Sequence, residues 1–162
     1  MSRQHMCLNL SQINLSQIGC EGASDHIVRL ESKVCDMFGE LIYDAYKNTV
    51  DDHGESLDDA KKEARYTFDG GYGAVLWDNS FGLIVDDRLI SVSLVTFFND
   101  EPLLAFVATK KEFQNRGFAE LLVRESINSL CLSGHDLITL VVTKENIPAI
   151  SLYNKLNFKN EE

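Results

Sequence analysis

The sequence predicts a mixed α/β fold of the α+β kind, in which helices flank a central, mostly antiparallel sheet. Two observations carry this prediction. Three β-rich runs follow one another across short turns between Phe81 and Thr109, as in an antiparallel meander. A strand, a helix and a second strand then span residues 103–143, and such a crossover places the second strand beside the first in one sheet.

The first 22 residues are expected to contribute one edge strand plus a connection. A short duplication lies there, because Asn9–Ile13 is followed by the near-identical Asn14–Ile18. Since the motif is repeated only once, it does not indicate a repeat architecture.

Two helices are expected next. From Ile27 to Ala45 the apolar residues recur at helical spacing, and Asp25 is the expected N-cap. Ser56 and Asp59 form a capping-box pattern that predicts a second helix. Its inward-facing residues would be Ala60, Ala64 and Phe68.

The meander and the crossover follow from the remaining pattern. Phe81–Val85 and Leu89–Phe98 are predicted to form a hairpin, and a turn at Asn99–Pro102 leads into a strand at Leu103–Thr109. The helix expected next spans Gly117–Leu132.

The C-terminal part is predicted to hold one strand and one helix. Leu137–Thr143 is apolar except at Thr139, which is typical of a strand covered on both faces. The last helix is expected to begin near Pro148 and to end near Asn157.

The length and net charge of the chain exclude several classes of protein. The 162 residues fit a single domain, 1–162, and the net charge of −10 disfavours a nucleic-acid or membrane-surface protein, so neither partner is expected. A cationic partner fits better. No apolar run reaches the length of a membrane span and no export signal precedes the domain, which predicts a cytoplasmic protein. The cysteines and histidines lack metal-ligand spacing, so no metal site is expected.

An anion-binding turn is predicted at one strand-to-helix junction, the segment Gln114-Asn115-Arg116-Gly117-Phe118-Ala119. The first N–H groups of a helix have no partner within it and carry the positive end of the helix dipole. The small residues Gly117 and Ala119 let a diphosphate approach that backbone. Glycine at such a turn also occurs for conformational reasons alone, so this segment needs support from elsewhere in the chain.

That support comes from the segment Asn146–Phe158. Asn146, Ala149, Leu152, Tyr153, Lys155 and Phe158 match the pattern Asn-x-x-Ala-x-x-Leu-Tyr-x-Lys-x-Gly-Phe. Together with Gln114, Gly117 and Ala119, they resemble the GNAT (Gcn5-related) N-acetyltransferase superfamily. The resemblance covers roughly Ile27–Phe158. It implies a V-shaped splay between the fourth and fifth strands.

The resemblance also implies how acetyl-CoA, the acyl donor, would bind. The strand edge formed by Phe106, Val107, Ala108 and Thr109 would hold the pantetheine amides, and one N–H near Val107 would polarise the thioester carbonyl. Gln114, Asn115, Arg116, Gly117, Phe118 and Ala119 would hold the pyrophosphate. Tyr153 would protonate the departing thiolate as the catalytic acid. Asn146 would either cap the last helix or bind the pantetheine arm.

The general base is not identified. Many superfamily members carry a glutamate on the fourth strand, but Leu103–Thr109 contains no acid. Ordered water would serve instead, or a side chain from the first two helices: Tyr43, Asp44, Asp52 or His53. The acceptor is expected to be a cationic amine, because five acids gather on the link between those helices: Asp51, Asp52, Glu55, Asp58 and Asp59.

Two features of the sequence depart from the superfamily pattern. Asn157 stands at a usual glycine, and asparagine tolerates the left-handed cap required there. Only five residues follow the last helix, so the final hairpin is expected to be shortened, leaving an edge for a second chain or the N-terminal segment to pair with. A homodimer is therefore one expectation.

The resemblance thus predicts an acetyl-CoA-dependent N-acetyltransferase that acts on a primary amine of a small molecule or peptide by direct attack. The alternative, which the missing base leaves open, is a catalytically weak GNAT-fold module that binds coenzyme A as a sensor or interaction partner.

Overall fold

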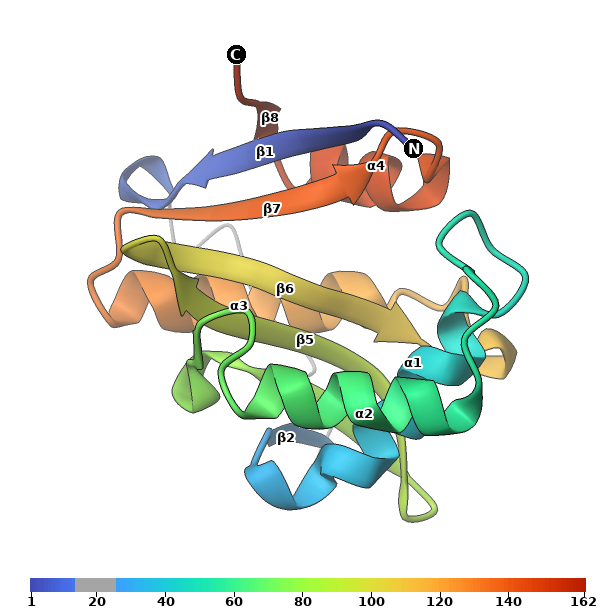
Figure 1. Ribbon diagram of the computed structural model, residues 1–162. Helices are drawn as coiled ribbons and strands as arrows, with labels where there is room; N and C mark the ends of the chain where they lie inside the picture. The colour runs from blue at the N-terminus through green and yellow to red at the C-terminus, as the bar shows by residue number, and fades with distance from the viewer. Residues whose placement is uncertain (14–25) are drawn as a thin grey trace.

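The structure is a computed structural model, and it describes residues 1–13 and 26–162 (Figure 1). Short 3-10 helices occupy residues 10–12, 32–34, 77–79 and 111–113. The helices and strands are, in chain order, β1 (Arg3–Asn9), β2 (Ile27–Arg29), α1 (Cys35–Tyr46), α2 (Leu57–Phe68), β3 (Ala74–Val75), β4 (Phe81–Val85), β5 (Arg88–Phe98), β6 (Glu101–Thr109), α3 (Phe118–Leu132), β7 (Leu137–Thr143), α4 (Ile147–Lys155) and β8 (Lys159–Asn160).

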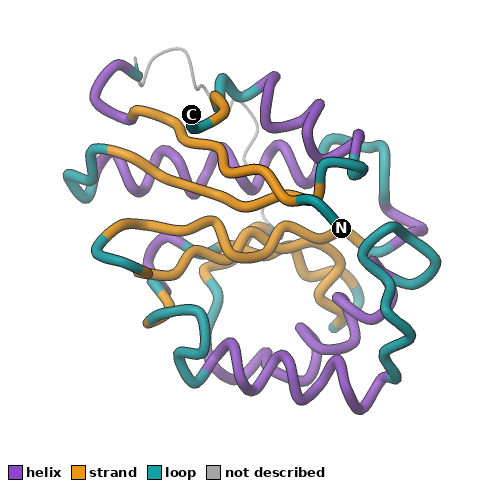
Figure 2. Tube along the Cα trace, turned by 45° about the horizontal axis from the view of Figure 1, so that its top comes forward, coloured by secondary structure: helices purple, strands orange, loops and turns teal. Residues whose placement is uncertain are grey.

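One sheet carries all the strands, in the order β2-β4-β5-β6-β7-β1-β8, and β3 pairs with β5 beside this path. Every pairing is antiparallel except that of β6 with β7. Helices lie on both sides of the sheet (Figure 2), with α1 packed on β5 and β6 and α3 packed on β4, β5 and β6. The predicted mixed fold with a mostly antiparallel sheet is therefore confirmed.

The meander forms as predicted, with two tight turns. Asp86 and Asp87 join β4 to β5, and Asn99 and Asp100 join β5 to β6, all four with φ between 50° and 64°. Two successive positive φ values are typical of the turn that matches the twist of a hairpin, and Asn and Asp tolerate them. The second turn is tighter than expected, so β6 begins at Glu101 instead of Leu103.

The helix predicted from Ile27 is wrong in its first half. Ile27–Arg29 forms the short strand β2, which pairs antiparallel with β4, and α1 begins at Cys35. The apolar residues of this strand complete the edge of the sheet, so tertiary pairing overrides the local helical spacing. The expected N-cap, Asp25, lies outside the described residues, and Val34 occupies the N-cap of α1.

The second helix begins where the capping box predicts. The Ser56 hydroxyl accepts the Asp59 N–H at 3.1 Å, and the Asp59 carboxylate accepts the Ser56 N–H at 2.9 Å. Ala60 and Ala64 are buried against α1, and Phe68 packs on Phe38 with a ring separation of 5.1 Å. These contacts hold α2 against α1, which packs on β5 and β6.

The N-terminal strand completes the sheet after the short C-terminal end. β1 pairs with β7 along its whole length, from Arg3 opposite Thr143 to Asn9 opposite Leu137. It is not an edge strand as expected, because β8 pairs with it at Met6 and Cys7. The final hairpin is indeed shortened to this two-residue strand, and the N-terminal segment takes the available edge of β7. A homodimer stays a prediction, and the second copy of the duplication lies outside the described residues.

Removing the Met6 side chain is expected to destabilise the protein by about 2–5 kcal/mol, the usual cost of truncating a large buried side chain. Met6 is fully buried in the core between β1, β7 and α4. Chemical denaturation of Met6→Ala measures the loss, with His5→Ala as a matched control on the exposed face of the same strand. Equal stability of the two variants would contradict the central place given to β1.

The crossover and the last helix also agree with the sequence. β7 spans Leu137–Thr143 as predicted, and Gly134, with a φ of 84°, ends the preceding turn. Pro148 lies in the first turn of α4. Asn157 has a φ of 69°, so it serves as the left-handed cap that was expected of it. Among the described helices, none is long and apolar enough to cross a membrane.

Candidate active site

The two parallel strands at the centre of the sheet separate after a single pairing. Leu103 of β6 lies opposite Thr139 of β7, and beyond this point the strands diverge toward their carboxyl ends (Figure 1). A bulge supports the divergence, because Leu104 and Phe106 pair with consecutive residues of β5 and Ala105 has no partner there. Among the described residues, no strand pairs with the β7-facing edge of β6 from Phe106 onward, which confirms the predicted splay.

A cavity of about 690 Å³ lies at the open end of the splay. This volume is within the range of small-molecule sites. Its walls come from β6, β7, α1, α2, α4 and the α1–α2 link, residues 47–56. The charged side chains that line it are five carboxylates, Asp51, Asp52, Glu55, Asp59 and Glu63, and two basic groups, Arg3 and Lys47.

Four of the predicted site residues reach this cavity. Phe106, Val107, Asn146 and Tyr153 line it, so the structure brings together residues from β6 and from α4 with its N-cap that are 39 positions or more apart in the sequence. Ala108 and Thr109 are buried at the end of β6 and do not line it. Instead, Thr109 bonds the Ser91 hydroxyl at 2.8 Å within the sheet.

Tyr153 is the most deeply buried tyrosine of this cavity, with 8% of its surface exposed. Its ring contacts Phe158 at a centroid distance of 5.7 Å, which holds the side chain against the core. Burial, and secondarily the Asp51 carboxylate, raises the pKa of Tyr153 above its ordinary value. The phenol therefore stays protonated over the neutral range and is available as a proton donor.

Asp51 joins the α1–α2 link to the opposite wall. Its carboxylate accepts the Thr143 hydroxyl at 2.7 Å and the Asn146 side-chain amide at 3.2 Å. The side-chain oxygen of Asn146, Oδ1, accepts the Ala149 N–H at 3.2 Å. This side chain therefore caps α4, which is one of its two expected roles. The sequence indicated Asp51 only as one acid of a cluster, and its hydrogen bonds fix it beside Tyr153.

The predicted anion-binding segment lies beyond the cavity, where β6 leads into α3. Gly117 is the N-cap of α3, with a φ of 81°, and no side chain caps this helix start. A Cβ built on Gly117 meets no atom within 4 Å, so open space lies in front of the turn. Gln114 donates to the Thr109 carbonyl at 2.9 Å, and this bond fixes the start of the segment.

The remaining residues of this segment are arranged around the same turn. Asn115 has a φ of 62°, and Phe118 and Ala119 form the first turn of α3. The Arg116 guanidinium folds back, donating to the Glu112 carbonyl at 3.1 Å and lying 5.4 Å from the Phe113 ring. The Arg116 side chain is thus held on the Lys111–Phe113 side of the turn by these two contacts.

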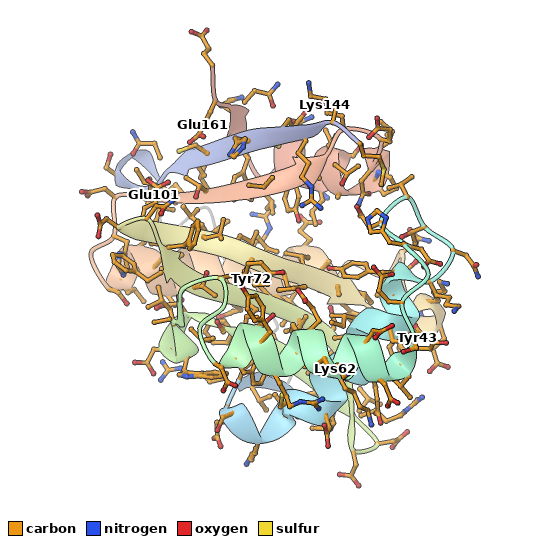
Figure 3. All side chains as sticks on the ribbon, viewed as in Figure 1. Tyr43, Lys62, Tyr72, Glu101, Lys144 and Glu161 are labelled. Atoms are coloured by element: carbon orange, nitrogen blue, oxygen red, sulfur yellow. The ribbon has the colours of Figure 1, made fainter. Side chains whose placement is uncertain are left out.

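The base candidates are placed differently from one another. Tyr43, Asp52 and His53 line the cavity, whereas Asp44 accepts the Lys111 N–H at 2.8 Å outside it. Hydrogen bonds from the Asn48 and Gly54 N–H groups hold the pKa of Asp52 below its usual value. β6 does contain one acid, Glu101, but this residue lies at the closed end of the splay (Figure 3).

Among the cavity residues that were not predicted, three bear on its chemistry: Tyr46, Glu63 and Tyr72. The Tyr72 hydroxyl donates to the Glu63 carboxylate, and burial raises the pKa values of both Tyr46 and Tyr72. A signal for Tyr72 was present in the sequence, since a lone aromatic residue stands among three glycines at Gly70–Gly73. The sequence contained no such signal for Glu63, because glutamates are common on the exposed side of amphipathic helices.

The C-terminal half of the chain matches a known family. The sequence profile of the family described as FR47-like protein matches residues 82–162, which is half of the chain. The chain belongs to the FR47-like family. The GNAT superfamily indicated by the two motifs is thereby confirmed. All the predicted donor-binding and catalytic residues lie inside the matched part of this FR47-like chain, whereas Asp51, Glu63 and Tyr72 lie outside it.

A curated relative matches part of the chain. The [ribosomal protein bS18]-alanine N-acetyltransferase of Salmonella typhimurium is 33% identical over 76 residues, which cover 47% of the FR47-like chain and 51% of the relative. The alignment thus spans about half of the length of that relative.

Two solved structures share the fold. A GCN5-related N-acetyltransferase from Sphaerobacter thermophilus aligns with a TM-score of 0.70 at 12% identity, covering 98% of this chain and 48% of that one. The PaiA N-acetyltransferase of Thermoplasma acidophilum was solved in complex with coenzyme A. It aligns with a TM-score of 0.63 at 18% identity, and the alignment covers 83% of this chain and 89% of that one. These likenesses establish a GNAT-type architecture for the FR47-like chain.

Proposed function

We propose that this FR47-like protein is an acetyl-CoA-dependent N-acetyltransferase that transfers the acetyl group to a primary amine of a small molecule or peptide. The observation that carries the proposal is a buried, protonated tyrosine, Tyr153, in a cavity at the point where β6 and β7 separate. The relatives support it, since the curated protein that shares 33% identity is named as an N-acetyltransferase.

The residues fit acetyl-CoA as the donor. The free edge of β6 at Phe106–Thr109 presents backbone groups of the kind that bind the amides of a pantetheine arm. The uncapped start of α3 and the open space at Gly117 suit a diphosphate, which is stabilised by unpaired N–H groups and the helix dipole. A structure of a related fold solved with coenzyme A gives further support.

The transfer needs two contributions from the protein: stabilisation of the negative charge on the thioester oxygen and protonation of the departing thiolate. The amine nitrogen attacks the thioester carbonyl carbon, and a backbone N–H near Val107 stabilises the negative charge that develops on its oxygen. The carbon–sulfur bond then breaks, and the Tyr153 hydroxyl donates its proton to the departing sulfur. The attacking nitrogen loses a proton to water, and the tyrosinate regains one from water, which balances the transfer. The raised pKa of Tyr153 means that the phenol is protonated when the thiolate forms.

The acceptor is proposed to be a cation. Five carboxylates line the cavity against two basic side chains, which gives the site a negative field. The Salmonella relative is named for an alanine of a ribosomal protein, so a peptide amine remains within the proposed class beside small amines. No residue is assigned as the general base.

A thiol-release assay with acetyl-CoA and a panel of amines tests the function. We expect release that depends on the amine, and a preference for cationic amines that weakens at high salt because screening reduces the attraction. Coenzyme A binding without amine-dependent release would instead support the sensor or interaction module. Equal rates with cationic and neutral amines at low salt would remove the argument for a cationic acceptor.

A further inference from the structure

A second polar pair lies in the cavity apart from Tyr153. The Tyr72 hydroxyl donates to the Glu63 carboxylate, and both side chains line the cavity and are half-buried. Figure 3 shows Tyr72 between α2 and β6. Burial, and then the contact with Glu63, raises the pKa of Tyr72, so the phenol persists as a hydrogen-bond donor.

The turn that carries Tyr72 has a conformation that other residues would not adopt. A Cβ on Gly71 would lie 2.2 Å from the Tyr66 ring, and a Cβ on Gly73 would lie 2.2 Å from the Phe97 carbonyl oxygen. Gly73 also has a φ of 95°, which disfavours any side chain. The two glycines therefore let the turn pack closely on α2 and β5, and Tyr72 points from it toward the cavity.

Three further contacts hold the Tyr72 ring and backbone. The Thr96 hydroxyl donates to the Tyr72 carbonyl at 2.7 Å. The ring meets those of Tyr66 and Phe106 edge-on, at centroid distances of 5.3 and 5.9 Å. A side chain held this way is preorganised, which lowers the entropic cost of binding a ligand.

Glu63 differs from the other carboxylates of the cavity. Asp52, Glu55 and Asp59 accept backbone N–H groups of the α1–α2 link itself, and Asp51 joins the link to β7 and α4. Those four stabilise the local structure. The Glu63 carboxylate accepts only the Tyr72 hydroxyl among the described residues, and no described cation forms an ion pair with it.

The two polar pairs belong to opposite walls. Tyr153 and Asp51 are fixed to the wall formed by β7 and α4, whereas Glu63 and Tyr72 belong to the wall formed by α2 and its following turn. Tyr46 of α1 lines the same cavity. An acceptor whose amine reacts beside Tyr153 thus has a second anionic site available across the cavity.

We infer that Glu63 and Tyr72 bind a second, non-reacting cationic group of the acceptor, so that the acceptor is a dication: a diamine, or an amine near a basic side chain. The inference rests on the proposed function. The cation would sit on the carboxylate and on the phenol oxygen, and nearby rings of the cavity such as Phe106 would offer their faces to it.

Acetyl transfer to 1,4-diaminobutane and to n-butylamine, which differ by one amine, tests this inference. We expect the wild-type kcat/KM to favour the diamine by about ten-fold or more, the usual effect of one hydrogen bond to a charged group. Glu63→Gln should abolish this preference with the KM for acetyl-CoA unchanged. Tyr72→Phe, which keeps the ring, should reduce it. Glu40 is an exposed acid that pairs with Lys61 on the helix surface. Glu40→Gln removes the same charge as Glu63→Gln and should keep the preference for the diamine.

Calorimetric binding of 1,4-diaminobutane in the presence of coenzyme A separates this inference from the proposed function. Diamine binding that depends on Glu63 without any turnover would support the inference and refute the acetyltransferase. Turnover with the same diamine preference in Glu63→Gln as in the wild type would overturn the inference and leave the acetyltransferase standing. Equal kcat/KM values for the two amines in the wild type would also overturn it.

Discussion

Replacing Tyr153 by phenylalanine is expected to lower kcat by about 10²–10⁴-fold, the contribution of a positioned general acid. Only the hydroxyl is lost, and the ring keeps its contact with Phe158. The KM for acetyl-CoA should therefore stay near its wild-type value. Steady-state thiol release with a saturating amine measures both constants.

The pH dependence gives the same prediction an independent readout. Because burial raises the pKa of Tyr153, its acid form persists as the pH rises through about 10, the ordinary value for tyrosine. The wild-type kcat should show no fall caused by loss of this proton between pH 7 and 10. A wild-type rate in the phenylalanine variant would show that another donor protonates the thiolate.

A valine at Gly117 is expected to raise the KM for acetyl-CoA by ten-fold or more. The branched side chain would occupy the open space in front of the uncapped N–H groups of α3, and a φ of 81° is strained for any β-branched residue. Gln114→Ala should have a smaller effect, because the proposed affinity comes mainly from the backbone.

Gly134→Val is the matched control for this substitution. Gly134 has a φ of 84°, a Cβ there also meets no atom within 4 Å, and it lies at the other end of α3. Both variants should lose similar stability, but only the one at Gly117 should lose affinity. An unchanged KM in Gly117→Val would remove the pyrophosphate assignment from this turn.

The sequence predicted the part of the fold that depends on local pattern. The hairpin turns, the capping box at Ser56 and the buried strand Leu137–Thr143 each follow from neighbouring residues, and the structure confirms them. The strand β2 was missed because its three residues also fit the spacing of the following helix. Its conformation is decided by pairing with β4, which no local pattern contains.

The residues of the candidate site also fall into two groups, those that local sequence motifs predict and those that only the tertiary structure brings together. The proposed donor side could be inferred from the sequence, since Gln114–Ala119 and Tyr153 belong to short motifs with a direct physical role. The proposed acceptor side is assembled from α1, α2 and the α1–α2 link, which lie outside the part that matches the family. Glu63 meets Tyr72 only because a glycine turn folds back on α2, and that contact follows from tertiary structure alone.

The pairing of β1 with β7 bears out one of the two pairings that the sequence left open. A short C-terminal end predicted an edge that either a second chain or the N-terminal segment would pair with. β1 lies against β7 over seven residue pairs, and it brings Arg3 to the rim of the cavity. The N-terminal strand therefore contributes to both the sheet and the lining of the proposed site.

A crystal structure of the protein with coenzyme A tests the central claim most directly. We predict the pantetheine arm along the free edge of β6 between Phe106 and Thr109, with its sulfur toward Tyr153 and the pyrophosphate at the start of α3. Coenzyme A bound away from the β6–β7 splay, or with its sulfur remote from Tyr153, would contradict the proposed site.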